Sequence, residues 1–257
     1  MGRSKSIVDK YFIYCESSFT QRNGTVVCGV LPSLTLHEQF PYQAKPETTA
    51  EHMGRAALLA GHFMMYYPDI IAEEKRFDYL MQILTHDVGE YKNGDILDDG
   101  SLLRCALARS ARDEEMEIMD EYYCDLPGKH GIRMVEIMND FENYKGEAVF
   151  FKLIEKLDAV LFQIFLYTKG VSGDVRRKTP PSKRDLRYAK IIDSTRAVEV
   201  WAFHLRLLAR DYAPEKYWKP VRKVLEAAFR SVYGYLPSCM TVDTADVPLD
   251  CPEDYAA

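Results

Sequence analysis

The chain has 257 residues, of which 47% are hydrophobic and 28% are charged, a balance typical of an ordinary globular protein. Its formal net charge of −6 disfavours a broad surface for nucleic acid, and no stretch is apolar for long enough to span a membrane. The first residues also lack the apolar run of a signal peptide. We therefore expect neither a nucleic-acid nor a membrane partner. A small anionic substrate stays compatible with the charge.

The six cysteines are scattered along the chain and form no Cys-x-x-Cys pair. This pattern argues against a zinc–cysteine site and against a disulfide scaffold. Reduced thiols are usual in the cytoplasm, so we expect a cytoplasmic protein.

Residues 1–47 are expected to form an N-terminal arm. A short helix is predicted over residues 6–16 and a short strand over Thr25–Val30. The pieces that follow, up to Pro46, are typical of a fixed loop and not of a domain linker.

A strong helix start follows, because Thr48-Thr49-Ala50-Glu51 has the pattern of a capping box. The helix is predicted to run to about Tyr67 and to end at Pro68. His52 lies beside its apolar stripe and is expected to point into the core, where the simplest role is that of a hydrogen-bonded core histidine. The stripe comprises Met53, Ala56, Ala57, Ala60, Phe63 and Met64.

A central helix is predicted over residues 70–91, before Asn93-Gly94-Asp95 breaks it. Its apolar positions recur at helical spacing at Phe77, Leu80, Met81, Leu84 and Val88. On such a helix His86, Asp87 and Glu90 fall within one arc of about 100°. Two metal-type ligands and one more carboxylate would then face one way. Taken alone, these polar residues could equally be a helix end, with Gly89 as the stop signal.

Further helices are predicted at about 101–124, 130–143 and Glu147–Tyr167. In the last of these, Asp158 falls on an apolar stripe that also includes Phe151, Ile154, Phe162 and Phe165. Lys152, Glu155 and Lys156 are assigned to the opposite face, toward solvent. Burying a carboxylate on an apolar stripe costs roughly several kcal/mol of folding free energy unless the carboxylate is paired. A metal ion would supply a partner for Asp158.

The remaining chain has a basic loop over Gly170–Arg187, which is either solvated surface or a lid over an anionic site. Two amphipathic helices near 195–211 and 215–233 follow, and the tail from Pro237 is expected to be loosely ordered. Without a repeat or an internal break, the chain is interpreted as one all-α domain. Its predicted parts are an arm (1–47), a metal-binding helical core (48–168), a basic loop with C-terminal helices packed on that core (169–236) and a tail (237–257).

The residues that carry chemistry are His52 on one helix, His86 and Asp87 on a second, and Asp158 on a third. Two imidazoles and two carboxylates suit a borderline divalent ion such as manganese, cobalt, iron, zinc or copper. Four protein ligands on an octahedral ion leave places for water and for a substrate oxygen.

This order of His, His-Asp and Asp resembles the metal-binding signature of the HD-domain phosphohydrolases. The segments Glu47–Met53, His86–Glu90 and Gly94–Ile96 also resemble the 5′-deoxynucleotidase branch, over residues 45–168. The resemblance implies a single HD-domain helical bundle with additional C-terminal helices. It implies that His52, His86, Asp87 and Asp158 are the metal ligands.

Further roles follow from the same resemblance. It implies that Glu90 handles the attacking water and that Asp95 lies on the sugar side of the pocket. In the relatives an arginine before the first motif helps to hold phosphate. The nearest candidates here are Arg22 and Lys45, and neither matches the motif cleanly; Lys45 is taken as the substrate-binding candidate. Relatives are often dimers, so a homodimer is compatible with the sequence.

The sequence therefore predicts a metal-dependent phosphohydrolase that acts on nucleoside 5′-monophosphates, deoxynucleotides above all. The short spacing from Asp87 to Asp158 and the Gly94-Asp95 turn favour a small monophosphate. Three alternatives stay open. The substrate could be a nucleoside triphosphate or a cyclic or alarmone nucleotide; the protein could bind metal or nucleotide as a regulator without turnover; or the polar residues could simply be satisfied inside a helical bundle.

Overall fold

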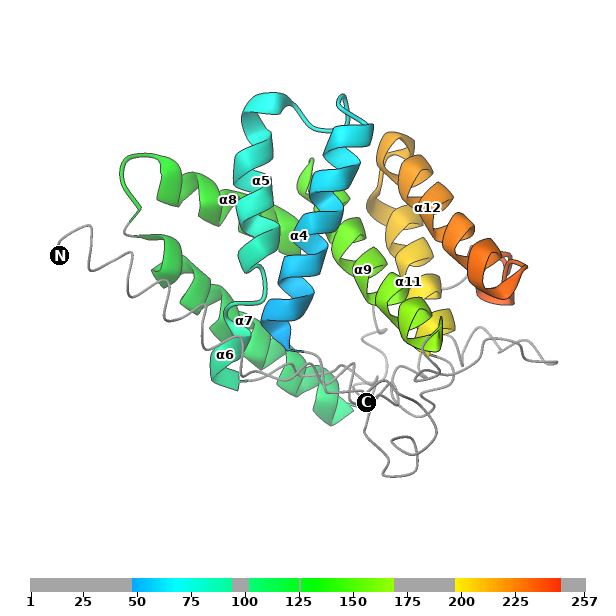
Figure 1. The fold of residues 1–257 in the computed structure, drawn as a ribbon. Coiled ribbons are helices and arrows are strands. Elements are labelled where there is room, and N and C mark those ends of the chain that lie inside the picture. The colour runs from blue at the N-terminus through cyan, green and yellow to red at the C-terminus, as the bar shows by residue number, and fades with distance from the viewer. Residues whose placement is uncertain (1–47, 94–101, 125, 169–196, 246–257) are drawn as a thin grey trace. The chain divides into compact units, whose positions relative to one another are not determined.

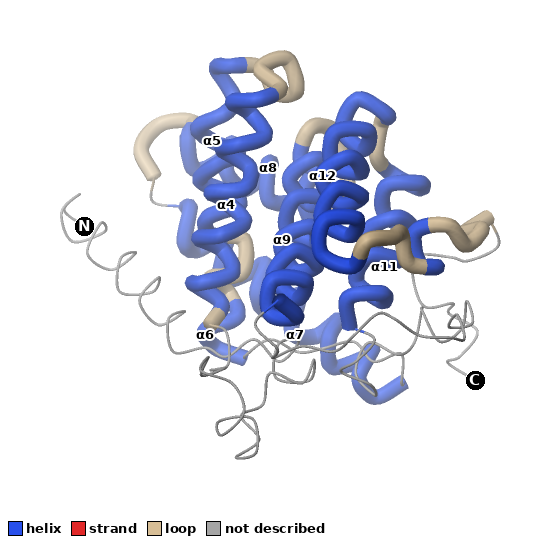
Figure 2. Tube along the Cα trace, turned by 45° about the vertical axis from the view of Figure 1, so that its right-hand side comes forward, coloured by secondary structure: helices blue, strands red, loops and turns tan. Residues whose placement is uncertain are grey.

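The computed structural model describes residues 48–93, 102–124, 126–168 and 197–245, and every regular element within these ranges is helical (Figure 1, Figure 2). The all-α prediction is confirmed. Within the same ranges no helix has both the length and the apolar character needed to cross a bilayer. The predicted helix at 6–16, the predicted strand at Thr25–Val30 and the basic loop at Gly170–Arg187 lie outside the described residues.

Two compact units can be distinguished along the chain. The first contains α4, α5, α6, most of α7, α8 and α9 as far as Glu155; the second contains the rest of α9, then α11, α12 and η3. The sequence showed no boundary inside α9, and the predicted domain limits stay predictions. The bounds are α4 (Thr49–Tyr66), α5 (Glu73–Thr85), α6 (Glu90–Asn93), α7 (Leu102–Cys124), α8 (His130–Glu142), α9 (Ala148–Thr168), α11 (Ala197–Tyr212), α12 (Glu215–Tyr233) and the 3-10 helix η3 (Ser238–Met240).

The start of α4 is the predicted capping box. The Thr48 hydroxyl accepts a hydrogen bond of 3.2 Å from the Glu51 backbone N–H, and the Glu51 carboxylate accepts one of 2.9 Å from the Thr48 N–H. The predicted stripe is buried from Met53 to Met64, and His52 has no exposed surface. The capping box thus fixes the helix start one turn before a fully buried histidine.

The central helix is not continuous, which corrects the sequence prediction. Helix α5 ends at Thr85, the chain turns through residues 86–89, and α6 begins at Glu90. Tight hydrogen bonds hold the turn, from the Val88 N–H to the Thr85 carbonyl and from the Glu90 N–H to the Asp87 carbonyl, each 3.1 Å long. These bonds reach back three residues instead of four, so the side chains no longer follow one helical arc.

The buried face of α5 also differs from the predicted one. Phe77, placed on the apolar stripe by its spacing, is 70% exposed. The face turned inward consists of Tyr79, Gln82, Ile83 and Thr85. Two of these four are polar, which is why the apolar spacing alone selected the neighbouring face.

Gly89 serves close packing and not the helix stop expected from the sequence. Its backbone is not left-handed, as a glycine at a helix C-terminus commonly is. A Cβ atom at this position would instead lie 3.1 Å from the backbone of Glu115 on α7, and 3.0 Å from the Glu115 Cβ. The turn that carries His86 and Asp87 therefore packs directly against the α7 backbone.

Helix α5 packs against α4 and α8 (Figure 1). Its Tyr79 ring stacks on Phe151 of α9 with centroids 4.8 Å apart. Asp78 forms an ion pair of 2.7 Å with Arg133 of α8. The stacking therefore holds the middle of α5 against the first part of α9, and the ion pair holds it against α8.

In the second unit, η3 packs against α11. The Arg206 guanidinium donates hydrogen bonds to the carbonyl of Cys239 and, over 2.9 Å, to that of Val242. The expectation of a loosely ordered tail from Pro237 is therefore wrong for residues 238–245; residues 246–257 lie outside the described part of the chain. Helix α12 ends at Gly234, whose φ of 80° is left-handed.

Candidate metal centre

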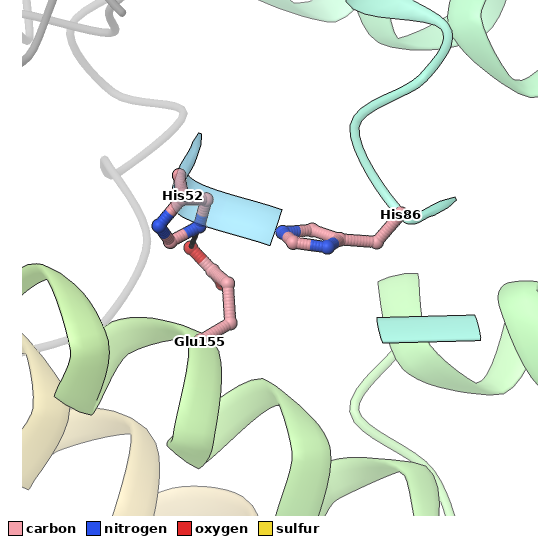
Figure 3. A group of neighbouring side chains, drawn as sticks. All are labelled: His52, His86 and Glu155. Atoms are coloured by element: carbon pink, nitrogen blue, oxygen red, sulfur yellow. Dashed lines mark ion pairs between the residues drawn. The ribbon is translucent and has the colours of Figure 1, made fainter. Parts of the chain in front are cut away.

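Three side chains from three separate elements converge within the first unit. His52 comes from α4, His86 from the residue that follows α5, and Glu155 from α9. One donor atom from each lies within 4.8 Å of the others. Figure 3 shows the His86 ring directed at His52, with the Glu155 carboxylate reaching the same point from α9.

The ring of His86 is oriented by its backbone. Its Nδ1 lies 2.7 Å from the Ile83 carbonyl oxygen, which can only accept, so Nδ1 carries the hydrogen. The Nε2 atom then has a free lone pair, the usual arrangement in a histidine that ligates metal. This Nε2 is buried and makes no hydrogen bond with any of the described residues. An orphaned buried acceptor of this kind fits a cation beside it.

Asp87 faces the same point from the turn. Its Oδ2 lies 3.2 Å from the His86 Nε2 and 3.9 Å from the His52 Nε2. On the other side, the His52 Nε2 lies 3.9 Å from Oε1 of Glu155. Nitrogens and carboxylate oxygens that surround one point at this spacing form a donor set for a borderline divalent ion.

Glu155 belongs to the converging group but is not among the ligands predicted from the sequence. It was assigned with Lys152 to the solvent face of α9, but Glu155 is 3% and Lys152 is 9% exposed. The signal lay in the helix itself, because apolar residues occur on every face between Ala148 and Leu157, the mark of a buried helix. A charged residue inside such a helix needs a partner.

Lys152 supplies part of the charge balance for Glu155. Its Nζ lies 3.7 Å from a Glu155 oxygen and 3.1 Å from a Glu142 oxygen, and it sits over the Phe141 ring at 4.2 Å. Burial lowers the pKa of Lys152, but the negative charges of Glu142 and Glu155 more than offset this and raise it above its ordinary value. The lysine is therefore a cation fixed one turn before Glu155.

Glu90 lies at the start of α6, next to the turn, and is 8% exposed. Its Oε2 accepts a hydrogen bond of 2.9 Å from the Thr49 hydroxyl on α4. The carboxylate proposed to handle water is thus held in place by the first turn of the helix that carries His52.

The other predicted site residues are placed less directly. Asp158 is buried, 5% exposed, and lies three residues beyond Glu155 on α9, but it is not a member of the converging group. Its role as a metal ligand stays a prediction. Asp95 and Lys45 lie outside the described residues, so their assignment to the substrate also stays a prediction.

A comparison with models of protein families shows which family the chain belongs to. Residues 38–178, more than half of the chain, match the model of the HD domain family. The chain belongs to the HD domain family. HD domains are metal-dependent hydrolases that bind divalent ions, and the donor set described above fits that requirement. No curated protein and no solved structure matches this HD domain chain significantly.

Proposed function

We propose that this HD domain protein hydrolyses the phosphate ester of nucleoside 5′-monophosphates, with deoxynucleotides as the preferred class. The observation that carries the proposal is the convergence of His52, His86 and Glu155, with Asp87 beside them and Glu90 on the adjoining turn. A donor set next to a separate, buried carboxylate is what water attack on a phosphate requires.

In this proposal His52, His86, Asp87 and Glu155 would hold the divalent ion. Glu155 then takes the place of Asp158, the fourth ligand predicted from the sequence. Such an ion polarises a phosphoryl oxygen and lowers the pKa of water. The protein's own contribution is orientation: Ile83 fixes the ring of His86 and Thr49 fixes the carboxylate of Glu90. The Glu90 carboxylate accepts the proton of the water as the oxygen–phosphorus bond forms. The bond from phosphorus to the 5′ oxygen breaks, and that oxygen leaves with the proton that Glu90 accepted from the water, which regenerates the carboxylate.

The choice of a monophosphate rests on the sequence. Gly94-Asp95-Ile96 resembles the segment that contacts the sugar in the 5′-deoxynucleotidase branch, and we assign Asp95 to the deoxyribose. Lys45, which precedes the first motif, is assigned to the phosphate. The short distance along the chain from the His-Asp pair to α9 leaves less room for the additional basic residues that a triphosphate needs.

A phosphate-release screen tests this function. Purified protein is given manganese or cobalt and a panel of nucleoside mono-, di- and triphosphates, ribose and deoxyribose forms, and cyclic nucleotides. We expect release of phosphate from deoxynucleoside 5′-monophosphates above all. If only triphosphates or cyclic nucleotides were hydrolysed, the protein would be an HD phosphohydrolase with a different substrate from the one proposed. No turnover on any member, with metal shown to be bound, would favour a regulatory binding protein.

A Glu90→Gln variant tests the assigned mechanism separately. It keeps the shape of the side chain and its acceptor for Thr49, so metal content should be unchanged, while turnover falls by about 10²–10⁴-fold because the base is lost. Glu114→Gln, at a partly exposed position on α7, is the matched control and should keep full activity. Full activity in Glu90→Gln would contradict the role given to this residue.

A further inference from the structure

The second unit contains a cavity of about 180 Å³ between α11, α12 and the segment that follows η3. Arginines make up half of its lining residues. The lining consists of Arg206, Arg210, Trp218, Arg222, Met240 and Thr244. Nothing in the proposed hydrolytic site uses these side chains, so the cavity requires its own explanation.

The two arginines on α11 are one helical turn apart, and Arg222 faces the cavity from α12. Arg206 donates only to the backbone carbonyls of Cys239 and Val242 and forms no ion pair within the described residues. Because a guanidinium has more N–H groups than these two bonds use, Arg206 keeps donors for a ligand. Among the residues that the structure describes, no carboxylate lies in direct contact with its charge.

The nearby carboxylates balance the other two arginines. Arg210 pairs with Asp211 at 2.5 Å and Arg222 pairs with Glu226 at 2.7 Å. The negative charge of Asp243 acts to raise the pKa of both Arg206 and Arg210. Burial lowers the pKa of Arg206, and the like charge of Arg222 adds to that effect. Of the three arginines, Arg206 is the one that forms no ion pair within the described residues, so its guanidinium is the group best placed to meet an anionic ligand.

We propose that this cavity binds a phosphate group. A guanidinium group can donate two parallel hydrogen bonds to two oxygens of one phosphate. Two arginines, Arg206 and Arg210, already attach residues 238–245 to α11, so the third arginine of the lining is not needed for that attachment. The volume is below the roughly 300–1,000 Å³ of pockets for whole small molecules. It suits orthophosphate or the phosphate end of a larger ester, with the Trp218 ring as one wall.

Trp218 provides a local reporter, because Trp201 is the only other tryptophan of the chain. In a Trp201→Phe background, fluorescence and calorimetry are followed while sodium orthophosphate is added at constant ionic strength, with sodium chloride as the reference. We expect a saturable response to orthophosphate. A deoxynucleoside 5′-monophosphate forms the second arm: a response to both identifies a site for free phosphate, and a response to the ester alone identifies a site for the ester.

Two exposed arginines of α12 make the matched comparison. Arg222→Ala should weaken phosphate binding about tenfold or more, since it removes charge-assisted bonds to the ligand. Arg230→Ala, on the same helix but outside the cavity lining, should bind as the parent does. Both positions are exposed, so the variants are expected to fold, which thermal unfolding verifies. A His86→Ala variant should keep the Trp218 response, because the proposal is independent of the metal centre.

Three results would overturn the proposal. One is the lack of any saturable response in either arm, and another is an equal response to chloride. The third is an equal loss of affinity in Arg222→Ala and Arg230→Ala, which would assign the binding to general surface charge and not to the cavity.

Discussion

The Thr49 hydroxyl donates a hydrogen bond of 2.9 Å to the Glu90 carboxylate, across 41 positions of sequence. Thr49 is the first residue of α4 and has no exposed surface, and Glu90 is the first residue of α6. The bond joins the helix that carries one histidine of the metal centre to the turn that carries the other. It also fixes the direction of one oxygen of the Glu90 carboxylate.

Replacing Thr49 by valine should impair turnover without removing the metal. Valine keeps the shape but deletes the hydroxyl, so the Glu90 carboxylate loses one donor and its fixed orientation. We expect kcat on the proposed substrate to fall about tenfold, which corresponds to roughly 1.4 kcal/mol. Thr49→Ser retains the hydroxyl and should recover most of the activity. An active Thr49→Val enzyme would show that this bond serves only folding.

Glu155 and Asp158 offer a direct test of which α9 carboxylate holds the ion. Because Glu155 belongs to the converging donor group, Glu155→Gln should reduce metal affinity by more than the roughly 10–100-fold that outer partners of a metal site contribute. Asp158→Asn should keep its metal. Metal content of the two purified variants, measured by mass spectrometry, decides the point. Loss of metal in Asp158→Asn, with metal retained in Glu155→Gln, would show that Asp158 is the ligand, as the sequence predicts.

Lys152 should matter for stability. Replacing it by methionine leaves the carboxylates of Glu142 and Glu155 without their shared cation. Removing one partner from a buried charge cluster costs about 3–5 kcal/mol, so urea unfolding in the presence of a chelator should show a loss of that order. The control is Lys145→Met at an exposed position, where less than about 0.5 kcal/mol is expected. Similar losses in both would refute the charge argument.

Two glycines should respond in opposite directions to alanine. A Cβ atom at Gly131 would lie 2.5 Å from the carbonyl oxygen of Tyr123, so Gly131→Ala must push α8 away from α7. We expect a destabilisation of about 1–3 kcal/mol. A Cβ atom at Gly61, inside α4, would have no atom within 4 Å. Gly61→Ala should therefore raise the free energy of unfolding by roughly 0.5–1 kcal/mol. Thermal unfolding of both variants measures the contrast.

Cys239 should resist alkylation in the folded protein. Burial raises the pKa of its thiol, and the charge of Glu199 raises it further. Because only the thiolate reacts, raising the pKa keeps Cys239 protonated and inert at pH 7–9. Cys124 is exposed and should react under the same conditions. Peptide mapping after treatment with iodoacetamide separates the two, and early labelling of Cys239 would contradict the burial described here.

The parts of the fold that could be predicted depend on local chemistry. The capping box at Thr48 and Glu51 and the apolar stripe of α4 require only residues within the same helix, and both are confirmed. The helix predicted at 130–143 is also present as α8, whose buried residues Met134, Ile137, Met138 and Phe141 recur at helical spacing. His52 was placed facing inward by the same reasoning, since its direction follows from the phase of α4.

What could not be predicted depends on contacts between distant segments. The apolar spacing continues from Leu84 to Val88 as though the helix went on, and the local stop signal, Gly89, lies four residues beyond the end of α5 at Thr85. Glu155 was assigned to solvent because its neighbours Lys152 and Lys156 are charged. Its burial is supported by Glu142, on another helix, through Lys152. A pairing of this kind has no signature in the order of residues along α9.

The contact of Gly89 with the Glu115 backbone has a consequence for protein engineering. His86 and Asp87 lie in the turn of residues 86–89. The conformation of this turn depends on its contact with the α7 backbone as well as on its own hydrogen bonds. Transplanting α4 and α5 alone into another scaffold would therefore leave the turn without the α7 backbone that supports it. A successful graft must also carry the middle of α7, although α7 contributes no residue to the group of donors described above.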